Sequence, residues 1–388
     1  MYGKILLTLS SIIVIFFVLE IIVRNIIPTA SPYYLKDGRL IWDNRGFWIN
    51  QPNQSQHYTN IIDFNNKSMR TDNSGLRYVP CRKNQNPNSP KIYIFGDSQT
   101  FGFGVSDQET WANQLQCLIS KEKFQYNVFN LGVPGTNIDE YIARTKMIFN
   151  NLKKRDIVIY AITWNDFHTP YSKTLNFKPS PSCSTDITNH PIFCPPNRNK
   201  FHYRTNTWRR KLYESTGFFV PSFSNFKDFV NTVVYTSAIA SIIVPIMRGL
   251  YIKYRKSNTL EKIGSQVFYT SNNLIRLLDR TIRQKTENVI FVFLPSRISY
   301  VRELYNLYSN EGKNFPEQDF LWHFAQKSCE DYSINCISFF QALKTHQTGT
   351  HDYPFDGHLN KTGSKKVAQA LFNYILSNIP VKKDRSLQ

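Results

Sequence analysis

Several short segments carry residues whose types and neighbours suit acyl-transfer chemistry. Ser98 ends a Gly-Asp-Ser tripeptide that follows an apolar run, and Asp356 and His358 lie close together near the end of the chain. A serine hydroxyl becomes a nucleophile when a histidine takes its proton, and that histidine needs a carboxylate to hold its tautomer. Gly132 and Asn165 end other apolar runs, where a backbone N–H or a side-chain amide can stabilise developing negative charge. These residues predict a serine nucleophile with a base, an orienting acid and an oxyanion hole.

Each segment also has an ordinary structural interpretation. Gly-Asp-Ser makes good turns, and a glycine such as Gly132 is common where a strand turns into a helix. Asn165 suits a cap or a turn, and Asp356 followed by His358 suits an Asx-type turn with a surface histidine. The chemical interpretation therefore depends on whether the fold brings the segments together.

Apolar runs that alternate with amphipathic segments must position these residues. Runs that are apolar throughout indicate strands at 91–95, 126–132, 156–164, 288–295 and 334–339. Apolar residues at helical spacing indicate helices at about 109–121, 138–152, 319–332 and 365–376. This alternation predicts an α/β fold with a mainly parallel sheet covered on both faces. Such folds place reactive groups beyond the carboxyl ends of the strands.

The order Ser, Gly, Asn and then Asp with His, each at a strand end, resembles that of the SGNH (GDSL-type) hydrolase superfamily. The resemblance covers residues 91–376 and implies a three-layer α/β/α sandwich of flavodoxin-like type. It implies that Ser98 is the nucleophile, His358 the general base and Asp356 its orienting acid. It also implies an oxyanion hole made by the Ser98 amide, the Gly132 amide and the Asn165 side chain.

The stretches "GDSQTFGFGV" and "TDNSGLR" look like those of a membrane-anchored branch of bacterial envelope proteins. The chain departs from the superfamily in its last motif, because most members have Asp-x-x-His, whereas one residue separates Asp356 from His358. Asp352 is therefore kept as an alternative acid. The shorter spacing is similar to that of exported polysaccharide O-acetyltransferases of the alginate type. Trp164 stands where the family often has glycine, and its ring either stacks on a sugar face or packs in the core.

The N-terminus is expected to be a membrane anchor. Residues 1–28 contain an apolar run long enough to cross a bilayer, and its charges are Lys4, Glu20 and Arg24. The run is longer than the apolar part of a usual signal peptide, so an uncleaved anchor is favoured over a cleaved signal.

The remaining chain is expected to hold one large domain. The predicted segments are an irregular lead-in at 29–90 with a hairpin, an SGNH-like domain at 91–380 with an insertion at about 167–257, and a basic tail at 381–388. Within the insertion, the apolar stretch 233–252 favours a packed helix, with an interfacial helix as the alternative.

Composition favours an exported protein with an anionic partner. The formal net charge is +19, and the cysteines are Cys81, Cys117, Cys183, Cys194, Cys329 and Cys336. Their even number is compatible with disulfides in an oxidising compartment, and buried free thiols are the alternative. Cys183 with Cys194, and Cys329 with Cys336, are close enough to close small loops. No cysteine has the spacing of a zinc ligand.

These observations predict a membrane-anchored serine ester hydrolase that acts on acyl esters, in particular acetyl esters of envelope or extracellular glycan. The alternatives are a polysaccharide O-acetyltransferase that uses the same residues, and a non-catalytic envelope protein that binds glycan. The chemistry requires no cofactor or metal. The catalytic domain is expected on the periplasmic or extracellular side of the membrane, which argues against nucleic acid as a partner.

Overall fold

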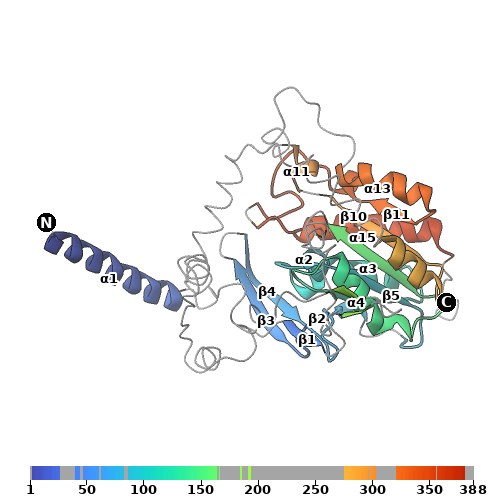
Figure 1. Ribbon diagram of the computed structural model, residues 1–388, viewed down its shortest axis with the longest axis horizontal. Helices are drawn as coiled ribbons and strands as arrows, with labels where there is room; N and C mark the ends of the chain where they lie inside the picture. The colour runs from blue at the N-terminus through green and yellow to red at the C-terminus, as the bar shows by residue number, and fades with distance from the viewer. Residues whose placement is uncertain are drawn as a thin grey trace.

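The computed structural model describes a central α/β domain, parts of the lead-in and an N-terminal helix (Figure 1). The described residues are 2–26, 40–43, 47–60, 63–82, 86–163, 166, 184–185, 191–193, 275–295, 297–302, 320–354 and 356–380.

Among these residues, parallel strands form a five-stranded sheet at the centre of the domain. Its strands are β5 (Lys91–Gly96), β6 (Asn127–Gly132), β7 (Ile157–Thr163), β10 (Val289–Leu294) and β11 (Cys336–Ser338). The strand order is β11-β10-β7-β5-β6. Each strand lies within a run that the sequence predicted, except that β5 ends one residue beyond 91–95. The α/β fold with a parallel sheet is therefore confirmed.

The strand order reverses beside β5. The chain continues from β5 to β6 on one side, whereas β7 and then β10 and β11 extend the sheet on the other side. In an open parallel sheet, the loops on either side of such a reversal diverge and leave room for a ligand beyond the carboxyl ends of the strands. Ser98 follows β5 and Asp166 follows β7, so both lie at this edge.

Helices cover both faces of the sheet. They are α3 (Trp111–Lys121), α4 (Ile138–Phe149), α13 (Phe320–Asp331) and α15 (Lys361–Asn378). Successive strand residues point to opposite faces. Ile92 and Ile94 of β5 share a core with α3 and α15, whereas Tyr93 and Phe95 share a core with α4 and α13.

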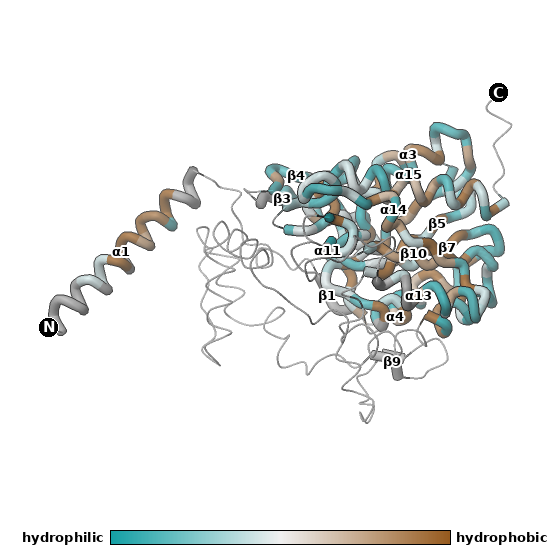
Figure 2. Tube along the Cα trace, turned by 90° about the horizontal axis from the view of Figure 1, so that it is seen from above, coloured by the Kyte–Doolittle hydropathy of each residue, from teal (hydrophilic) through white to brown (hydrophobic). Residues whose placement is uncertain are grey.

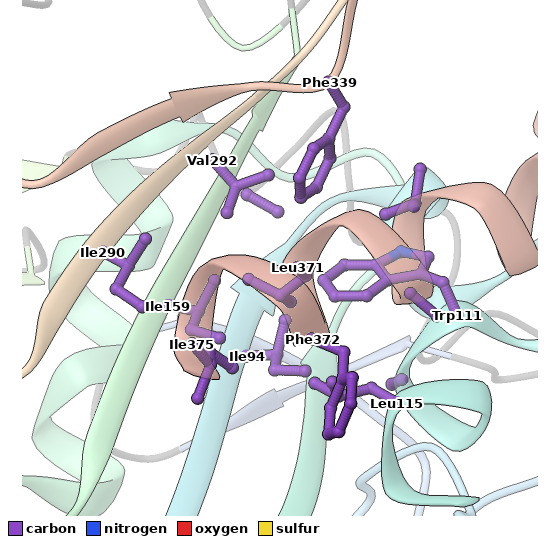
Figure 3. Packing of buried hydrophobic residues seen from close by; sticks show 14 of the residues in the cluster. Ile94, Trp111, Leu115, Ile159, Ile290, Val292, Phe339, Leu371, Phe372 and Ile375 are labelled. Carbon is purple, nitrogen blue, oxygen red and sulfur yellow. The ribbon is translucent and has the colours of Figure 1, made fainter. Parts of the chain in front are cut away.

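The core under α15 is made almost entirely of aliphatic and aromatic side chains. Figure 3 shows Leu371 and Ile375 of α15 packed towards Ile94 and Ile159 of the sheet, with Trp111 of α3 beside them. Each such side chain contributes about 1.5–3 kcal/mol through burial. Apolar residues concentrate along β5, β7 and β10 in Figure 2.

Short helices, most of which the sequence did not predict, join these elements. They are α2 (Ser98–Phe101), α11 (Arg297–Tyr300) and α14 (Phe340–Leu343), with 3-10 turns at Pro80–Arg82 and Asp107–Glu109. A single helical turn is too short to show a periodic apolar pattern, so such elements cannot be predicted from sequence periodicity.

The described part of the lead-in forms antiparallel hairpins. The strands β1 (Leu40–Asp43) and β2 (Phe47–Asn50) pair with each other, as do β3 (Ser55–Asn60) and β4 (Phe64–Arg70). Phe47 and Ile49 of β2 pack against α4. The lead-in therefore contains more regular structure than the irregular segment with a hairpin that was predicted. Its strands are rich in polar residues, so they do not stand out in the sequence as apolar runs.

Arg77 fastens the lead-in to the domain. Its buried guanidinium donates hydrogen bonds to the carbonyl oxygens of Ser68 and Val105, and its backbone N–H donates to Asn130 of β6. It also forms a 3.2 Å ion pair with the buried Asp107. Burial lowers the pKa of Arg77 to about 10, although the charge of Asp107 opposes this shift. Without these partners, the buried cation would strongly destabilise the fold.

Disulfides join Cys81 to Cys117 and Cys329 to Cys336. The second pair closes a small loop, as predicted. The first pair links the lead-in to α3, a long-range connection that the sequence did not identify.

Some predicted segments lie outside the described residues. They include the tail 381–388 and most of the insertion at 167–257, with Cys183 and Cys194 and the apolar stretch 233–252. Within the insertion, the structure describes the paired strands β8 (Ser184–Thr185) and β9 (Pro191–Phe193). The division of the chain into an anchor, a lead-in, a domain and a tail stays a prediction.

The N-terminal helix α1 spans Tyr2–Ile26. No helix in the described part of the chain has the length and apolar character needed to cross a bilayer. The membrane anchor predicted for residues 1–28 is therefore not supported.

Replacing Arg77 is expected to cost more stability than replacing the other partner of Asp107. Arg77→Met leaves a buried carboxylate without its buried cation and should lower the free energy of unfolding by about 3 kcal/mol. Arg70 pairs with the same carboxylate, but 43% of its side chain is exposed, so Arg70→Met should cost about 1 kcal/mol. Urea unfolding of the two variants measures the difference, and equal losses would show that Arg77 does not fasten the lead-in.

Candidate active site

Ser98 lies on a sharp exit from the sheet. The strand β5 ends at Gly96, Asp97 caps the next helical turn by accepting a hydrogen bond from the Gln99 N–H, and Ser98 is the first residue of α2. A Cβ at Gly96 would overlap the Thr100 side chain, so only glycine lets α2 turn back so closely on the strand. Thr163 at the end of β7 donates a hydrogen bond to the other Asp97 oxygen at 3.1 Å, which ties this turn to the neighbouring strand.

Ser98, His358 and Asp356 form a continuous hydrogen-bonded chain. The His358 Nε2 atom lies 2.8 Å from the Ser98 Oγ atom, and His358 Nδ1 contacts an oxygen of Asp356. Gly357 adopts a φ of +85°, a left-handed conformation that favours glycine. This turn lets an acid and a base with only one residue between them meet through their side chains. The sequence-predicted nucleophile, base and acid are thus brought together.

The alternative acid, Asp352, lies elsewhere. Its carboxylate is fully buried, pairs with Arg297 of α11 and accepts a hydrogen bond from the Gly349 N–H at 3.0 Å. Burial raises the pKa of Asp352, while the Arg297 charge opposes the shift. Arg297 also donates to the Pro354 carbonyl, so this pair braces the loop that leads to Asp356.

Gly132 has a packing function in this geometry. Its N–H already donates to the Asn130 side chain at 2.9 Å, and its carbonyl accepts from the Asn50 side chain at 3.0 Å. A Cβ at Gly132 would overlap the backbone of Phe101, so glycine lets the end of β6 approach α2. The oxyanion role predicted for the Gly132 amide is therefore not supported, because that N–H is already used within the loop.

Gly135 is the residue of the same loop whose amide is available. It is exposed and has a φ of +74°, and a Cβ added at this position would have no heavy atom within 4 Å. Among the described residues, neither the Gly135 N–H nor the Ser98 N–H donates a hydrogen bond. The sequence "NLGVPGTN" contains both Gly132 and Gly135, and the signal that separates them is position, since only Gly135 lies beyond the strand.

Asn165 and Trp164 lie outside the described residues, but the residues on either side of them are described. Asp166 is fully buried and accepts hydrogen bonds from the Tyr141 hydroxyl and the Thr163 N–H, both at 2.8 Å. Burial raises the pKa of Asp166 well above its ordinary value, and the nearby Asp97 carboxylate adds to the shift.

Arg144 joins the ends of two strands beneath the site. Its buried guanidinium donates hydrogen bonds to the carbonyl oxygens of Gly96 in β5 and Leu131 in β6. Burial lowers the pKa of Arg144, while the surrounding acidic groups oppose the shift. The chain continues from Gly96 to Ser98, and from Leu131 to the loop with Gly135. Arg144 therefore holds the start of the Ser98 turn and the start of the Gly135 loop at a fixed distance from each other.

Gln99 provides a second link between the nucleophile and the base. Its side-chain oxygen accepts a hydrogen bond from the Leu359 N–H at 3.0 Å, one residue after His358. Sequence reasoning missed this residue because its partner is 260 positions away. No group of histidine, cysteine and acidic side chains within the described ranges is arranged to hold a metal ion.

Substitution of Gly132 is expected to destabilise the fold more than substitution of Gly135. Gly132→Ala forces a methyl group against the Phe101 backbone and should cost about 3 kcal/mol of unfolding free energy. Gly135→Ala has open space and should cost only the strain of a positive φ, about 1 kcal/mol. Thermal unfolding of both variants measures the difference, and a Gly132→Ala loss no larger than that of Gly135→Ala would contradict the packing role.

Comparisons with known proteins bear on the part of the chain that contains Ser98. Residues 92–192 match the family model described as GDSL-like Lipase/Acylhydrolase. No curated protein gave a significant match. The solved lipase/acylhydrolase from Enterococcus faecalis is 13% identical with a TM-score of 0.39, and the alignment covers 76% of this chain and 99% of that one. The acetyl xylan esterase AlAXEase is 14% identical with a TM-score of 0.36, covering 74% and 99%. The matched segment contains Ser98 and spans less than half of the chain.

Proposed function

We propose that this protein is a serine ester hydrolase that cleaves acyl esters. The observation that carries the proposal is the contact between Ser98 Oγ and His358 Nε2 at 2.8 Å, with Asp356 on the opposite nitrogen of the same ring. A carboxylate on Nδ1 fixes the tautomer in which Nε2 accepts a proton, and it stabilises the imidazolium that forms. The GDSL-like family match over residues 92–192 supports the same chemistry.

The reaction proceeds through a covalent intermediate on Ser98. The Oγ atom attacks the acyl carbonyl carbon while His358 takes the hydroxyl proton. The resulting tetrahedral species collapses, the C–O bond to the alcohol breaks, and His358 returns the proton to the leaving oxygen. A water molecule then gives a proton to His358 while its oxygen attacks the acyl carbonyl carbon. The second tetrahedral species collapses, the bond between that carbon and Ser98 Oγ breaks, and His358 returns the proton to Oγ, which releases the carboxylic acid and restores Ser98.

The negative charge of the tetrahedral species needs donors that make no other hydrogen bond. We assign this role to the Ser98 N–H and the Gly135 N–H, with the Asn165 side-chain amide as a third donor. Gly135 replaces Gly132 in this assignment because the Gly132 N–H already binds Asn130. Thr163 and Asp166, which lie on either side of residues 164 and 165 in the sequence, are buried and joined by a hydrogen bond.

The disulfides favour an oxidising compartment for this domain. Cys81–Cys117 and Cys329–Cys336 would not persist in a reducing cytosol, so we place the protein on the exported side of a membrane. The net charge of +19 suits an acidic polymer as the carrier of the ester. We therefore propose acetyl esters of extracellular or envelope glycan as substrates.

Loss of the nucleophile should abolish ester hydrolysis. In the full-length protein, Ser98→Ala is expected to lower kcat for p-nitrophenyl acetate by about 10⁴-fold, and Asp356→Asn by about 10³-fold, since the triad acts as a unit. The exposed Ser74 provides a matched control, and Ser74→Ala should keep full activity. Hydrolysis that survives Ser98→Ala would refute the proposed function.

The second step distinguishes hydrolysis from transfer. Water as acceptor predicts release of free acetate at the same rate with or without added oligosaccharide. Mass spectrometry of oligosaccharide incubated with the protein and p-nitrophenyl acetate measures the alternative. Acetylated oligosaccharide that depends on Ser98 would identify an O-acetyltransferase instead of a hydrolase.

A further inference from the structure

The hairpin of β3 and β4 packs against both loops that carry the triad. Tyr58 and Phe64 of the hairpin contact Phe103, which follows α2, with ring centroids 5.5 and 6.2 Å apart. Phe64 also contacts Tyr353, which precedes Asp356, at 5.0 Å. We call this the hairpin cluster; its buried members are Tyr58, Phe64, Met69, Phe101, Phe103, Val105 and Tyr353.

The hairpin cluster continues to the base itself. The Phe103 ring lies 5.0 Å from the His358 ring, and the Tyr353 hydroxyl donates to the Gly104 carbonyl at 2.7 Å. The loop after Ser98 and the loop before His358 are therefore joined through side chains that also contact the hairpin. A residue fixed to this cluster is held in a defined position relative to both loops.

Asp63 is such a residue. It directly precedes the buried Phe64, and its carboxylate accepts a hydrogen bond from the Asp356 N–H at 2.6 Å. The same short loop is closed by Tyr353, whose carbonyl accepts from the Gly357 N–H and whose N–H donates to the His358 carbonyl. Asp63 thus supplies a contact from outside the loop to the backbone of the proposed acid.

We propose that Asp63 is a positioning residue for the Asp356–His358 pair, which makes the lead-in hairpin part of the active site. This inference rests on the proposed function. The hydrogen bond orients the Asp356 backbone, and through it the carboxylate that holds His358. The Asp63 charge also lies beside the pair and favours the protonated imidazole that forms when Ser98 attacks.

Several charged groups near these loops form ion pairs that do not include Asp63. Arg297 of α11 is paired with Asp352, and Glu109 is paired with Lys67 of β4 and approached by Lys361 of α15. Substitution of Asp63 leaves all of these pairs in place. A change in the pH profile of an Asp63 variant is therefore not expected to come from the loss of these pairs.

Separate variants distinguish the hydrogen bond from the charge. Asp63→Asn keeps an oxygen acceptor for the Asp356 N–H and loses the charge, whereas Asp63→Ala loses both. Asn65→Ala is the matched control, since Asn65 is exposed on the same hairpin. The assay is p-nitrophenyl acetate hydrolysis by the full-length protein from pH 5 to pH 9, with thermal unfolding of each variant.

We expect Asp63→Ala to lower kcat about tenfold with little change in KM, because the acid and base lose alignment. Asp63→Asn should keep kcat within about twofold and move the acid limb of kcat/KM to lower pH by about half a unit. Loss of negative charge disfavours the protonated histidine, so the base becomes neutral at lower pH. If Asp63→Ala fails to fold, the shift of the acid limb of kcat/KM in Asp63→Asn still tests the role of Asp63.

The outcomes separate this inference from the proposed function. Hydrolysis that is lost in Ser98→Ala but unchanged in kcat and pH profile in both Asp63 variants would overturn the role of Asp63 alone. Hydrolysis that persists in Ser98→Ala would overturn the proposed function and the role of Asp63 with it.

Discussion

The hydrogen bond between Ser98 and His358 is the interaction on which the candidate site depends, because it joins residues 260 positions apart. It forms only if the exit of β5 and the loop before α15 meet at one edge of the sheet. The glycines at the ends of β5 and β6 leave room for α2, and Gln99 holds the residue after His358. The parallel sheet and its covering helices thus have a direct chemical consequence, since they bring the nucleophile and the base within hydrogen-bonding distance.

Beneath this contact the protein buries several polar and charged side chains. Arg144 donates to carbonyls near the ends of β5 and β6, while Asp97 and Asp166 accept hydrogen bonds from Thr163 and Tyr141. Burial of these charges is costly unless each one has a partner, and such networks often fix geometry at functional sites. Here the network connects β5, β6 and β7 at the place where their loops must hold reactive groups at fixed distances.

The sequence predicted the elements whose signals are local. Strands appeared as apolar runs, the main helices as amphipathic periods, and Cys329–Cys336 as a close pair. Ser98, Asp356 and His358 could be selected because each follows or precedes such an element. The sequence could not show that the Gly132 N–H is already bound, nor that Asp63 reaches Asp356, because these depend on contacts between distant segments. The disulfide partner of Cys81 and the ion pair of Arg77 with Asp107 could not be predicted either, because they also join segments that are distant in the sequence.

The most direct test of this account is to locate the nucleophile chemically. The folded full-length protein can be incubated with a fluorophosphonate, which reacts with an activated serine, and its peptides can be analysed by mass spectrometry. A single phosphonate on Ser98 is expected, formed at least about 100-fold more slowly in His358→Ala because the base is lost. A phosphonate on another residue, or labelling of Ser98 that is equally fast without His358, would contradict it.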